Sequence, residues 1–214
     1  MIKAIILDNE GVMIQNDWNR VARAVAGEFS LPPKSGEKFK DSLRCGHDDE
    51  NNPLYQYVCG KISSADYWSL VLRSYGIPLT EQNRGSMSSK LELLTTVVNP
   101  DALEMVNRLK KSNYEVFLLS NATPEIVKGN ISRHDYFSLF DRCYFSYQIG
   151  CRKPSPEAYL TVTNENRLSP AECYFIDDKE ENVLAARKIG MSAERYKMGA
   201  DRLVDILCQH IPLS

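Results

Sequence analysis

Four acidic residues follow two short apolar runs of the amino-acid sequence. Asp8 and Glu10 come after the first run, near the N-terminus, and Asp177 and Asp178 come after a later one. A carboxylate can act as a nucleophile and form a covalent intermediate. A few carboxylates together can also hold Mg²⁺ beside a substrate phosphate. These residues therefore predict a magnesium site at which Asp8 attacks phosphorus.

A hydroxyl group and a cation follow two further apolar runs. Ser120, with Asn121 beside it, ends one run, and Lys153 comes after a weaker one. Phosphoryl transfer spreads negative charge over the equatorial phosphate oxygens, where donors and cations stabilise it. We therefore expect Ser120 and Lys153 to contact phosphate. Turnover of an aspartyl-phosphate needs a second acid or base, and Glu10 is the nearest candidate.

The apolar runs themselves indicate strands of a parallel sheet. Short, continuously apolar segments are typical of strands that are covered on both faces. Three such runs occur, at 2–7 (broken only by Lys3), 116–119 and 173–176, while 143–147 is a weaker fourth and 192–196 a candidate fifth. Helical patterns lie between them, which predicts an α/β fold with a doubly wound, Rossmann-like parallel sheet. The carboxyl ends of such strands share one edge, so the polar residues are expected to meet there.

Local signals mark where several of these helices begin and end. Thr123-Pro124 and Ser155-Pro156 each place a hydroxyl before a first-turn proline, which predicts a side-chain N-cap. Gly190 follows the predicted helix 180–189, where a left-handed C-terminal residue is expected. These signals place strand and helix in alternation over most of the chain.

Residues 15–90 interrupt the alternation of strand and helix. Two apolar stripes with helical spacing occur there, and no convincing strand lies between them. The stripes consist of Trp18, Val21, Ala22, Val25 and Phe29, and of Trp68, Val71, Leu72 and Tyr75. We interpret 15–90 as a small all-helical cap inserted into a core made of 1–14 and 91–214. Such a cap is expected to exclude water and to select the substrate.

The composition excludes several classes of protein. The chain has 214 residues, a hydrophobic fraction of 43% and a net charge of −2, which gives no general attraction for nucleic acid or anionic lipid. No apolar run is long enough to cross a membrane, and no secretion signal is visible. Six cysteines occur without a C-x-x-C pair, which argues against a zinc site. We expect a cytoplasmic protein with reduced cysteines and a small-molecule substrate.

The order and spacing of four motifs resemble those of the haloacid dehalogenase-like (HAD) hydrolases. The motifs are Ile6-Leu7-Asp8-Asn9-Glu10-Gly11-Val12, Leu119-Ser120-Asn121, Arg152-Lys153-Pro154 and Phe175-Ile176-Asp177-Asp178. The resemblance covers the predicted core, and each motif lies at the end of the expected element. The segment 145–154 is similar to the branch that contains glucose-1-phosphate phosphatases and the N-terminal phosphatase domain of soluble epoxide hydrolases.

The resemblance implies a Mg²⁺-dependent hydrolase of small phosphate monoesters. Asp8 would be the nucleophile and a metal ligand, and the backbone carbonyl of Glu10 would be a second ligand. Asp178, with Asp177 beside it, matches the metal-binding carboxylates of the family. The branch favours a sugar phosphate as the first substrate to test.

The resemblance also assigns the phosphate contacts and reveals one departure from the family. Ser120 and Lys153 would hold the phosphate, with Asn121 next to them. The family's phosphatases usually carry Asp two residues after the nucleophile, whereas this chain has Glu10. The extra methylene leaves the carbonyl ligand unchanged but displaces the carboxylate that would act as acid and base.

Two alternative functions stay open at the level of sequence. A carbon–halogen hydrolase would use Asp8 to attack carbon and would need no Mg²⁺, which leaves Asp177 and Asp178 without a role. A non-catalytic protein that binds phosphorylated ligands is the second alternative, motivated by Glu10. Turnover in excess chelator would favour the first, and ligand binding without turnover would favour the second.

Overall fold

A five-stranded, wholly parallel sheet forms the centre of the protein. The computed structural model describes residues 1–32, 49–92 and 94–212, so residues 33–48 of the predicted cap lie outside the described residues. The strand order is β5-β4-β1-β6-β7. The strands are β1 (Ala4–Leu7), β4 (Glu115–Ser120), β5 (Arg142–Phe145), β6 (Cys173–Asp177) and β7 (Ser192–Arg195). The predicted doubly wound fold is therefore confirmed, with a strand at each of the five predicted runs.

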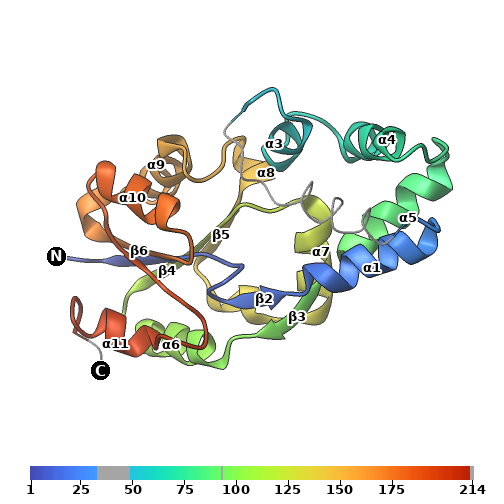
Figure 1. Ribbon diagram of the computed structural model, residues 1–214. Helices are drawn as coiled ribbons and strands as arrows, with labels where there is room; N and C mark the ends of the chain where they lie inside the picture. The colour runs from blue at the N-terminus through green and yellow to red at the C-terminus, as the bar shows by residue number, and fades with distance from the viewer. Residues whose placement is uncertain (33–48, 93, 213–214) are drawn as a thin grey trace.

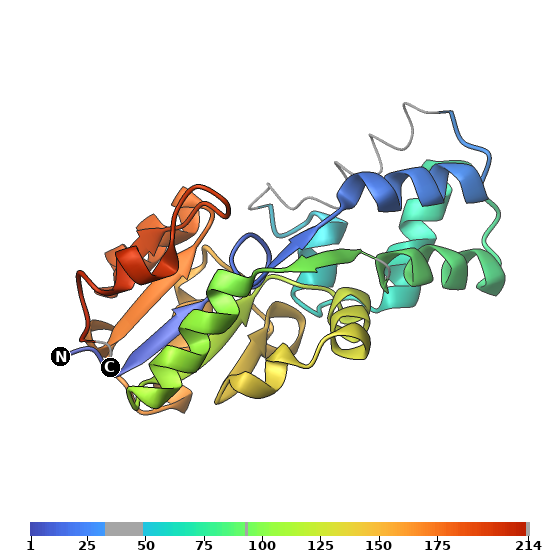
Figure 2. The same ribbon diagram turned by 90° about the horizontal axis from the view of Figure 1, so that it is seen from below.

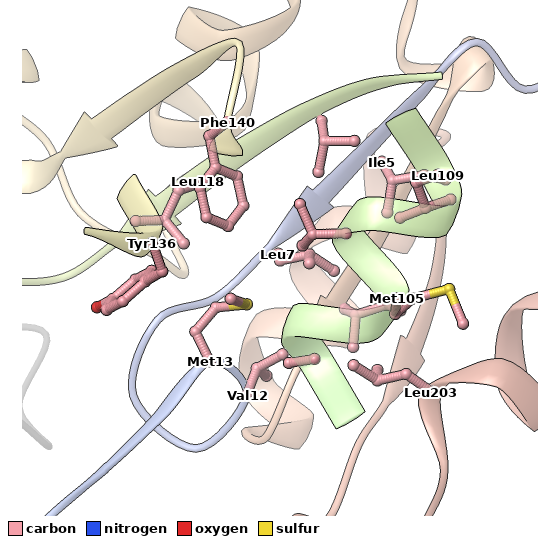
Figure 3. Close-up of a cluster of buried hydrophobic side chains, with 14 of the residues drawn as sticks. Ile5, Leu7, Val12, Met13, Met105, Leu109, Leu118, Tyr136, Phe140 and Leu203 are labelled. Atoms are coloured by element: carbon pink, nitrogen blue, oxygen red, sulfur yellow. The ribbon is translucent and has the colours of Figure 1, made fainter. Parts of the chain in front are cut away.

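Helices cover both faces of this sheet, as Figure 1 shows. α6 (Pro100–Lys111) and α11 (Leu203–Leu207) lie on one face, and α9 (Pro156–Glu165) and α10 (Glu180–Lys188) lie on the other. α7 (Pro124–Arg133) and α8 (Ser146–Ile149) follow β4 and β5, and short 3₁₀ turns lie at Tyr136–Leu139 and Pro170–Glu172. Alternate residues of a strand point to opposite faces. Ile5 and Leu7 accordingly pack with Leu109 of α6 (Figure 3), whereas Ala4 and Ile6 join a second cluster with α9 and α10. Burial of each large aliphatic side chain contributes roughly 1.5–3 kcal/mol.

Helix α6 shows how local sequence sets these boundaries. Asn99 accepts a hydrogen bond from the backbone N–H of Asp101, and Pro100 occupies the first turn. Basic residues in the last turn complement the negative end of the helix dipole. The buried stripe consists of Ala102, Met105, Val106 and Leu109. Capping, dipole and apolar spacing therefore agree with the observed helix.

Two predicted N-caps differ from the structure. Thr123 and Ser155 occupy the N-cap positions of α7 and α9, but neither side chain makes the capping hydrogen bond. The Ser155 hydroxyl instead donates to the carboxylate of Glu157. The prediction of a left-handed residue at Gly190 is confirmed, since its φ is +92°. The Thr-Pro and Ser-Pro dipeptides thus predict where these helices start. The side-chain rotamer decides whether the hydroxyl makes the capping hydrogen bond.

A two-stranded antiparallel ribbon leads away from the main sheet. It pairs β2 (Ile14–Asn16) with β3 (Thr95–Val98). β2 crosses the start of 15–90 and lies before the first helical stripe, so the prediction of no strand between the two stripes is not contradicted. The strand is only three residues long, too short to show a period of its own. Its partner lies about eighty residues further along the chain, so the pairing depends on tertiary structure.

Helices α1 (Trp18–Glu28), α3 (Pro53–Val58), α4 (Ser64–Ser74) and α5 (Glu81–Glu92) lie beyond this ribbon (Figures 1 and 2). They share a buried apolar cluster that is separate from the two clusters at the sheet. Its members include Val21, Val25, Tyr57, Trp68, Leu72, Met87 and Leu91. We propose that these four helices, called the cap helices below, are the described part of the predicted cap.

Glu125 of α7 joins the cap helices to the rest of the protein. Its buried carboxylate accepts hydrogen bonds from the Ser64 hydroxyl at 2.6 Å, from the Trp68 indole at 3.2 Å and from Ser88 at 3.3 Å. The Tyr57 hydroxyl also donates to it. Burial raises the pKa of Glu125, but these donors outweigh burial and the pKa lies below its usual value. The carboxylate therefore stays charged and holds three cap helices against α7.

Two further observations concern expectations from composition. Among the described residues, no helix has the length and apolar character needed to cross a membrane. Cys59, Cys143, Cys151, Cys173 and Cys208 are all free thiols.

Candidate active site

The predicted polar residues meet at the carboxyl edge of the sheet. Leu7 pairs with Leu118 on one side and with Ile176 on the other, so all three strands end at the same level. Asp8 comes directly after β1, and its backbone N–H donates to the carbonyl of Ile176 at 2.9 Å. Strand register therefore brings Asp8 beside Asp177, although the two are far apart in sequence.

Lys153 lies between two of these carboxylates. Its Nζ is 2.6 Å from Oδ1 of Asp8 and 2.6 Å from Oδ2 of Asp177. The ammonium group is almost wholly buried, with a side-chain exposure of 1%. The loop that carries it is held by Asn121, whose amide donates to the Lys153 carbonyl at 2.7 Å and accepts from the Lys153 N–H at 2.9 Å. Asn121, which lines the pocket as a predicted substrate-binding residue, thus also positions Lys153.

Asp177 and Asp178 have different surroundings despite being neighbours. Both oxygens of Asp177 accept hydrogen bonds, from Lys153, from the Asn182 amide and from the backbone N–H of Lys179. Oδ1 of Asp178 is buried and has no hydrogen-bond partner among the described residues. Asp178 is thus the carboxylate with free ligand capacity, and Asp177 mainly orients Lys153.

The carboxylates crowd more negative charge than Lys153 can neutralise. One oxygen from each of Asp8, Asp177 and Asp178 lies within 4.8 Å of the others. Burial, followed by repulsion from Asp177, raises the pKa of Asp8 to about 8 despite the neighbouring ammonium. Burial and Asp177 also raise the pKa of Asp178. Clustered oxygen ligands with an unpaired buried oxygen fit a hard divalent cation such as Mg²⁺.

Gly11 permits the close approach of Asp178 to the first loop. Its φ is +88°, a conformation that other residues rarely adopt. A Cβ atom there would lie 2.5 Å from Cγ of Asp178. The glycine is therefore required both by its backbone conformation and by the position of the acidic side chain.

Glu10 points toward the first cap helix. Its Oε1 accepts a hydrogen bond from the indole N–H of Trp18. Burial raises the pKa of Glu10, against the opposing effects of the Trp18 hydrogen bond and of Lys179. Glutamate is one methylene longer than aspartate, and its carboxylate is held by the hydrogen bond from the Trp18 indole.

A sequence model of the haloacid dehalogenase-like hydrolases matches residues 2–190, which is most of the chain. The protein belongs to this family. The membership confirms the resemblance predicted from the four motifs. The matched residues include every carboxylate of the site as well as Ser120 and Lys153.

Named relatives of this HAD-like hydrolase include phosphatases and dehalogenases. It is 32% identical to a D-ribitol-5-phosphate phosphatase of Bacteroides thetaiotaomicron over 94% of this chain and 95% of that one. It is 30% identical to the sesquiterpene phosphatase astK of Aspergillus oryzae over 64% of this chain and 68% of that one. It is 25% identical to (S)-2-haloacid dehalogenase 4A of Burkholderia cepacia over 61% of this chain and 59% of that one.

Solved structures share the fold of this HAD-like hydrolase. A HAD family enzyme of Bacteroides thetaiotaomicron, in complex with magnesium and inorganic phosphate, superposes with a TM-score of 0.77 at 23% identity, covering 94% of this chain and 97% of that one. The L-2-haloacid dehalogenase of Xanthobacter autotrophicus superposes with a TM-score of 0.65 at 22% identity, covering 99% and 84%.

A pocket of about 130 Å³ opens onto the acidic cluster of this HAD-like hydrolase. The residues predicted to act on phosphate that line it are Asp8, Glu10, Ser120, Asn121, Lys153 and Asp178. It is also lined by Asn16, Trp18, Val58, Thr123, Ile126 and Arg152. The second set comes partly from the ribbon and the cap helices, so the pocket forms where these meet the sheet.

Sequence reasoning missed several residues of this pocket. Asn182 binds both oxygens of Asp177, at 3.0 and 2.9 Å, and its place one helical turn beyond the acidic pair was the available signal. Trp18 was interpreted as a packing residue because it opens an apolar stripe. Asn16 and Thr123 carried no signal beyond a turn or cap preference, since their place at the pocket depends on distant elements.

Proposed function

We propose that this HAD-like hydrolase cleaves small phosphate monoesters through an aspartyl-phosphate formed on Asp8. The observation that carries the proposal is the buried cluster of Asp8, Lys153, Asp177 and Asp178 at the open edge of the sheet. It combines a nucleophile, a fixed cation and a cation-binding set of oxygens, which together suit an anionic phosphate. Relatives that are named phosphatases support the same conclusion.

We further propose Mg²⁺ as the cofactor, held by Asp8, by Asp178 and by the backbone carbonyl of Glu10. The unpaired oxygen of Asp178 and the crowding of negative charge support this ligand set. Asp177, whose oxygens already accept hydrogen bonds, would contribute by orienting Lys153. When bound, the cation would offset the repulsion between Asp8 and an incoming phosphate. A solved relative that contains magnesium supports the choice of metal.

The side chains divide the chemistry between two steps. An oxygen of Asp8 attacks phosphorus in line with the leaving oxygen, while Lys153 and the Ser120 hydroxyl donate to the equatorial oxygens. Glu10 gives its proton to the leaving alcohol. It then takes a proton from the water that hydrolyses the aspartyl-phosphate and so regains its original state. The indole of Trp18 fixes the Glu10 carboxylate at the pocket during both steps.

Sugar phosphates and related polyol phosphates are the first substrates to test. The support comes from the relative named for D-ribitol 5-phosphate and from the pocket, which mixes polar with apolar groups. A carbon–halogen hydrolase remains the second candidate because haloacid dehalogenases are among the relatives. The acidic cluster favours the phosphatase, since attack on carbon needs no divalent cation to neutralise a phosphate.

A substrate panel with and without Mg²⁺ tests the proposal. Sugar phosphates, polyol phosphates, nucleotides and 2-chloropropionate are assayed in Mg²⁺ and in excess chelator. We expect phosphate release that requires Mg²⁺ and disappears in Asp8→Asn. Glu104→Gln removes a carboxylate from the exposed surface of α6 and serves as the charge-matched control. Full activity of Asp8→Asn, or halide release in chelator without phosphate release, would refute the proposal.

A further inference from the structure

Thr123 carries a hydroxyl that the fold itself does not use. The residue occupies the N-cap position of α7, where a threonine commonly accepts a hydrogen bond from the first turn, yet it makes none. Thr123 is 4% exposed, and its buried Oγ1 has no hydrogen-bond partner among the described residues. An unpaired buried hydroxyl costs about 1–3 kcal/mol. The ligand-free fold bears this cost at a position three residues beyond Ser120.

Asn16, which lines the same pocket, carries a second buried polar atom without a partner among the described residues. Its side chain forms a hydrogen bond with Glu10 that lowers the pKa of that carboxyl group, so the amide NH₂ group of Asn16 is the donor. The other end of the amide, Oδ1, is buried and has no partner among the described residues. Asn16 comes from β2 and Thr123 from the start of α7, so the two residues line the pocket from different elements.

The chemistry of these two atoms defines what they can bind. A carbonyl oxygen only accepts, so Oδ1 of Asn16 needs a donor and is unsuited to a phosphate dianion. A threonine hydroxyl can donate or accept. The neighbouring wall is formed by Val58 and Ile126, which offer no side-chain hydrogen bond. A ligand that satisfies both atoms therefore carries hydroxyl groups outside its phosphate.

We infer that Thr123 and Asn16 are specificity-determining residues that bind hydroxyl groups of the leaving alcohol. The substrate class is then a phosphate ester of a small, uncharged polyol, such as a sugar or alditol, rather than of a hydrocarbon alcohol. The inference rests on the proposed phosphatase function and adds to it the part of the substrate that is recognised. Discrimination of this kind arises because an analogue without the hydroxyl leaves buried polar atoms unpaired.

The test compares two esters of equal chain length, pentitol 5-phosphate and n-pentyl phosphate. Thr123→Val removes the hydroxyl while keeping a branched side chain, and Thr123→Ser retains the hydroxyl as a matched control. We expect the parent protein to prefer the pentitol ester. We expect Thr123→Val to lower kcat/KM for that ester about 3–10-fold, the effect of one hydrogen bond, with pentyl phosphate changed less than about twofold. Thr123→Ser should retain the preference.

Two outcomes in this assay would overturn the inference while leaving the phosphatase intact. In one, Thr123→Val lowers the turnover of both esters equally, which would place the hydroxyl at the phosphate. In the other, the parent protein prefers pentyl phosphate. A clear fall in the Tm of Thr123→Val would also overturn it, because the hydroxyl would then support the fold.

Binding measurements separate failure of the inference from failure of the proposed function. Calorimetry with Asp8→Asn, alone and combined with Thr123→Val, uses pentitol 5-phosphate and inorganic phosphate as probes. We expect the added valine to weaken binding of the pentitol ester and to leave inorganic phosphate unchanged. If the parent protein cleaves neither ester but the variants show this binding selectivity, the proposed phosphatase activity is refuted. The hydroxyl contacts are then still supported. If adding Thr123→Val changes the affinity for neither probe, the proposed hydroxyl contacts are refuted.

Discussion

Replacing Asp8, the proposed nucleophile, should stabilise the metal-free protein in a pH-dependent way. Asp8→Asn removes one of the crowded carboxylates and keeps a side chain of nearly the same shape. The pKa of Asp8 is raised from 3.8 to about 8 by burial and by the neighbouring acids. Between these values the folded protein holds a proton that the unfolded chain has already released. The free energy of unfolding of the parent protein therefore falls as pH rises through this range.

The size of the effect follows from the raised pKa. Each pH unit between the two pKa values costs about 1.4 kcal/mol, so the parent protein loses about 3–4 kcal/mol between pH 5 and pH 8. Asparagine does not titrate, so the free energy of unfolding of Asp8→Asn does not fall for this reason. For a domain of this length that difference corresponds to a rise in Tm of roughly 6–16 °C. We therefore expect Asp8→Asn to exceed the parent in Tm at pH 8, with a much smaller difference at pH 5.

Thermal unfolding in excess chelator, at pH 5 and pH 8, measures this difference. Glu104→Gln, which removes an exposed carboxylate, should follow the parent at both pH values. Mg²⁺ added at pH 8 should raise the Tm of the parent more than that of Asp8→Asn, because the variant offers one fewer charged ligand. Equal Tm values of parent and Asp8→Asn at pH 8, or the same gap at both pH values, would refute the reasoning about crowded charge.

Three further substitutions test separate parts of the site. Lys153→Met leaves buried carboxylates without their cation, so urea unfolding at pH 8 should show a loss of about 3–5 kcal/mol; an unchanged midpoint would contradict the buried ion pairs. Gly11→Ala should weaken Mg²⁺ binding about 10–100-fold by calorimetry, as the loss of a supporting contact does. Gly76→Ala is its control, since Gly76 also has a positive φ but open space around it; equal effects would show backbone strain alone. Glu10→Gln should lower kcat about 10²–10⁴-fold in a phosphatase assay, and an unchanged rate would assign the acid and base elsewhere.

Much of the fold follows from local pattern. The segments that become β1, β4 and β6 are almost wholly apolar because these strands are covered on both faces. Burial on both faces therefore appears in the sequence as a continuous apolar run. The ribbon strand β2 escaped prediction because three residues carry no period and its pairing partner is distant. Local burial is therefore visible in sequence, whereas a short long-range pairing is not.

The residue types of the site could be identified from the sequence, but the hydrogen-bond partners of each residue could not. Asp177 and Asp178 are adjacent, yet one binds Lys153 and Asn182 while the other keeps an unpaired oxygen. Asn121 has the donor expected of a phosphate ligand, but its amide is engaged by the backbone of Lys153. These assignments depend on side chains that arrive from other elements.

The sequence by itself determined the parallel sheet, the place of Asp8 at its edge and the family of the protein, because apolar runs that end in polar residues are local features. Tertiary structure alone decided that the Trp18 indole donates to the carboxylate of Glu10 and that the buried hydroxyl of Thr123 has no hydrogen-bond partner among the described residues. The physical reason is that a hydrogen-bond partner is chosen by the packing of elements distant in the chain. Residue type states only what a side chain can bind, and the fold decides what it meets.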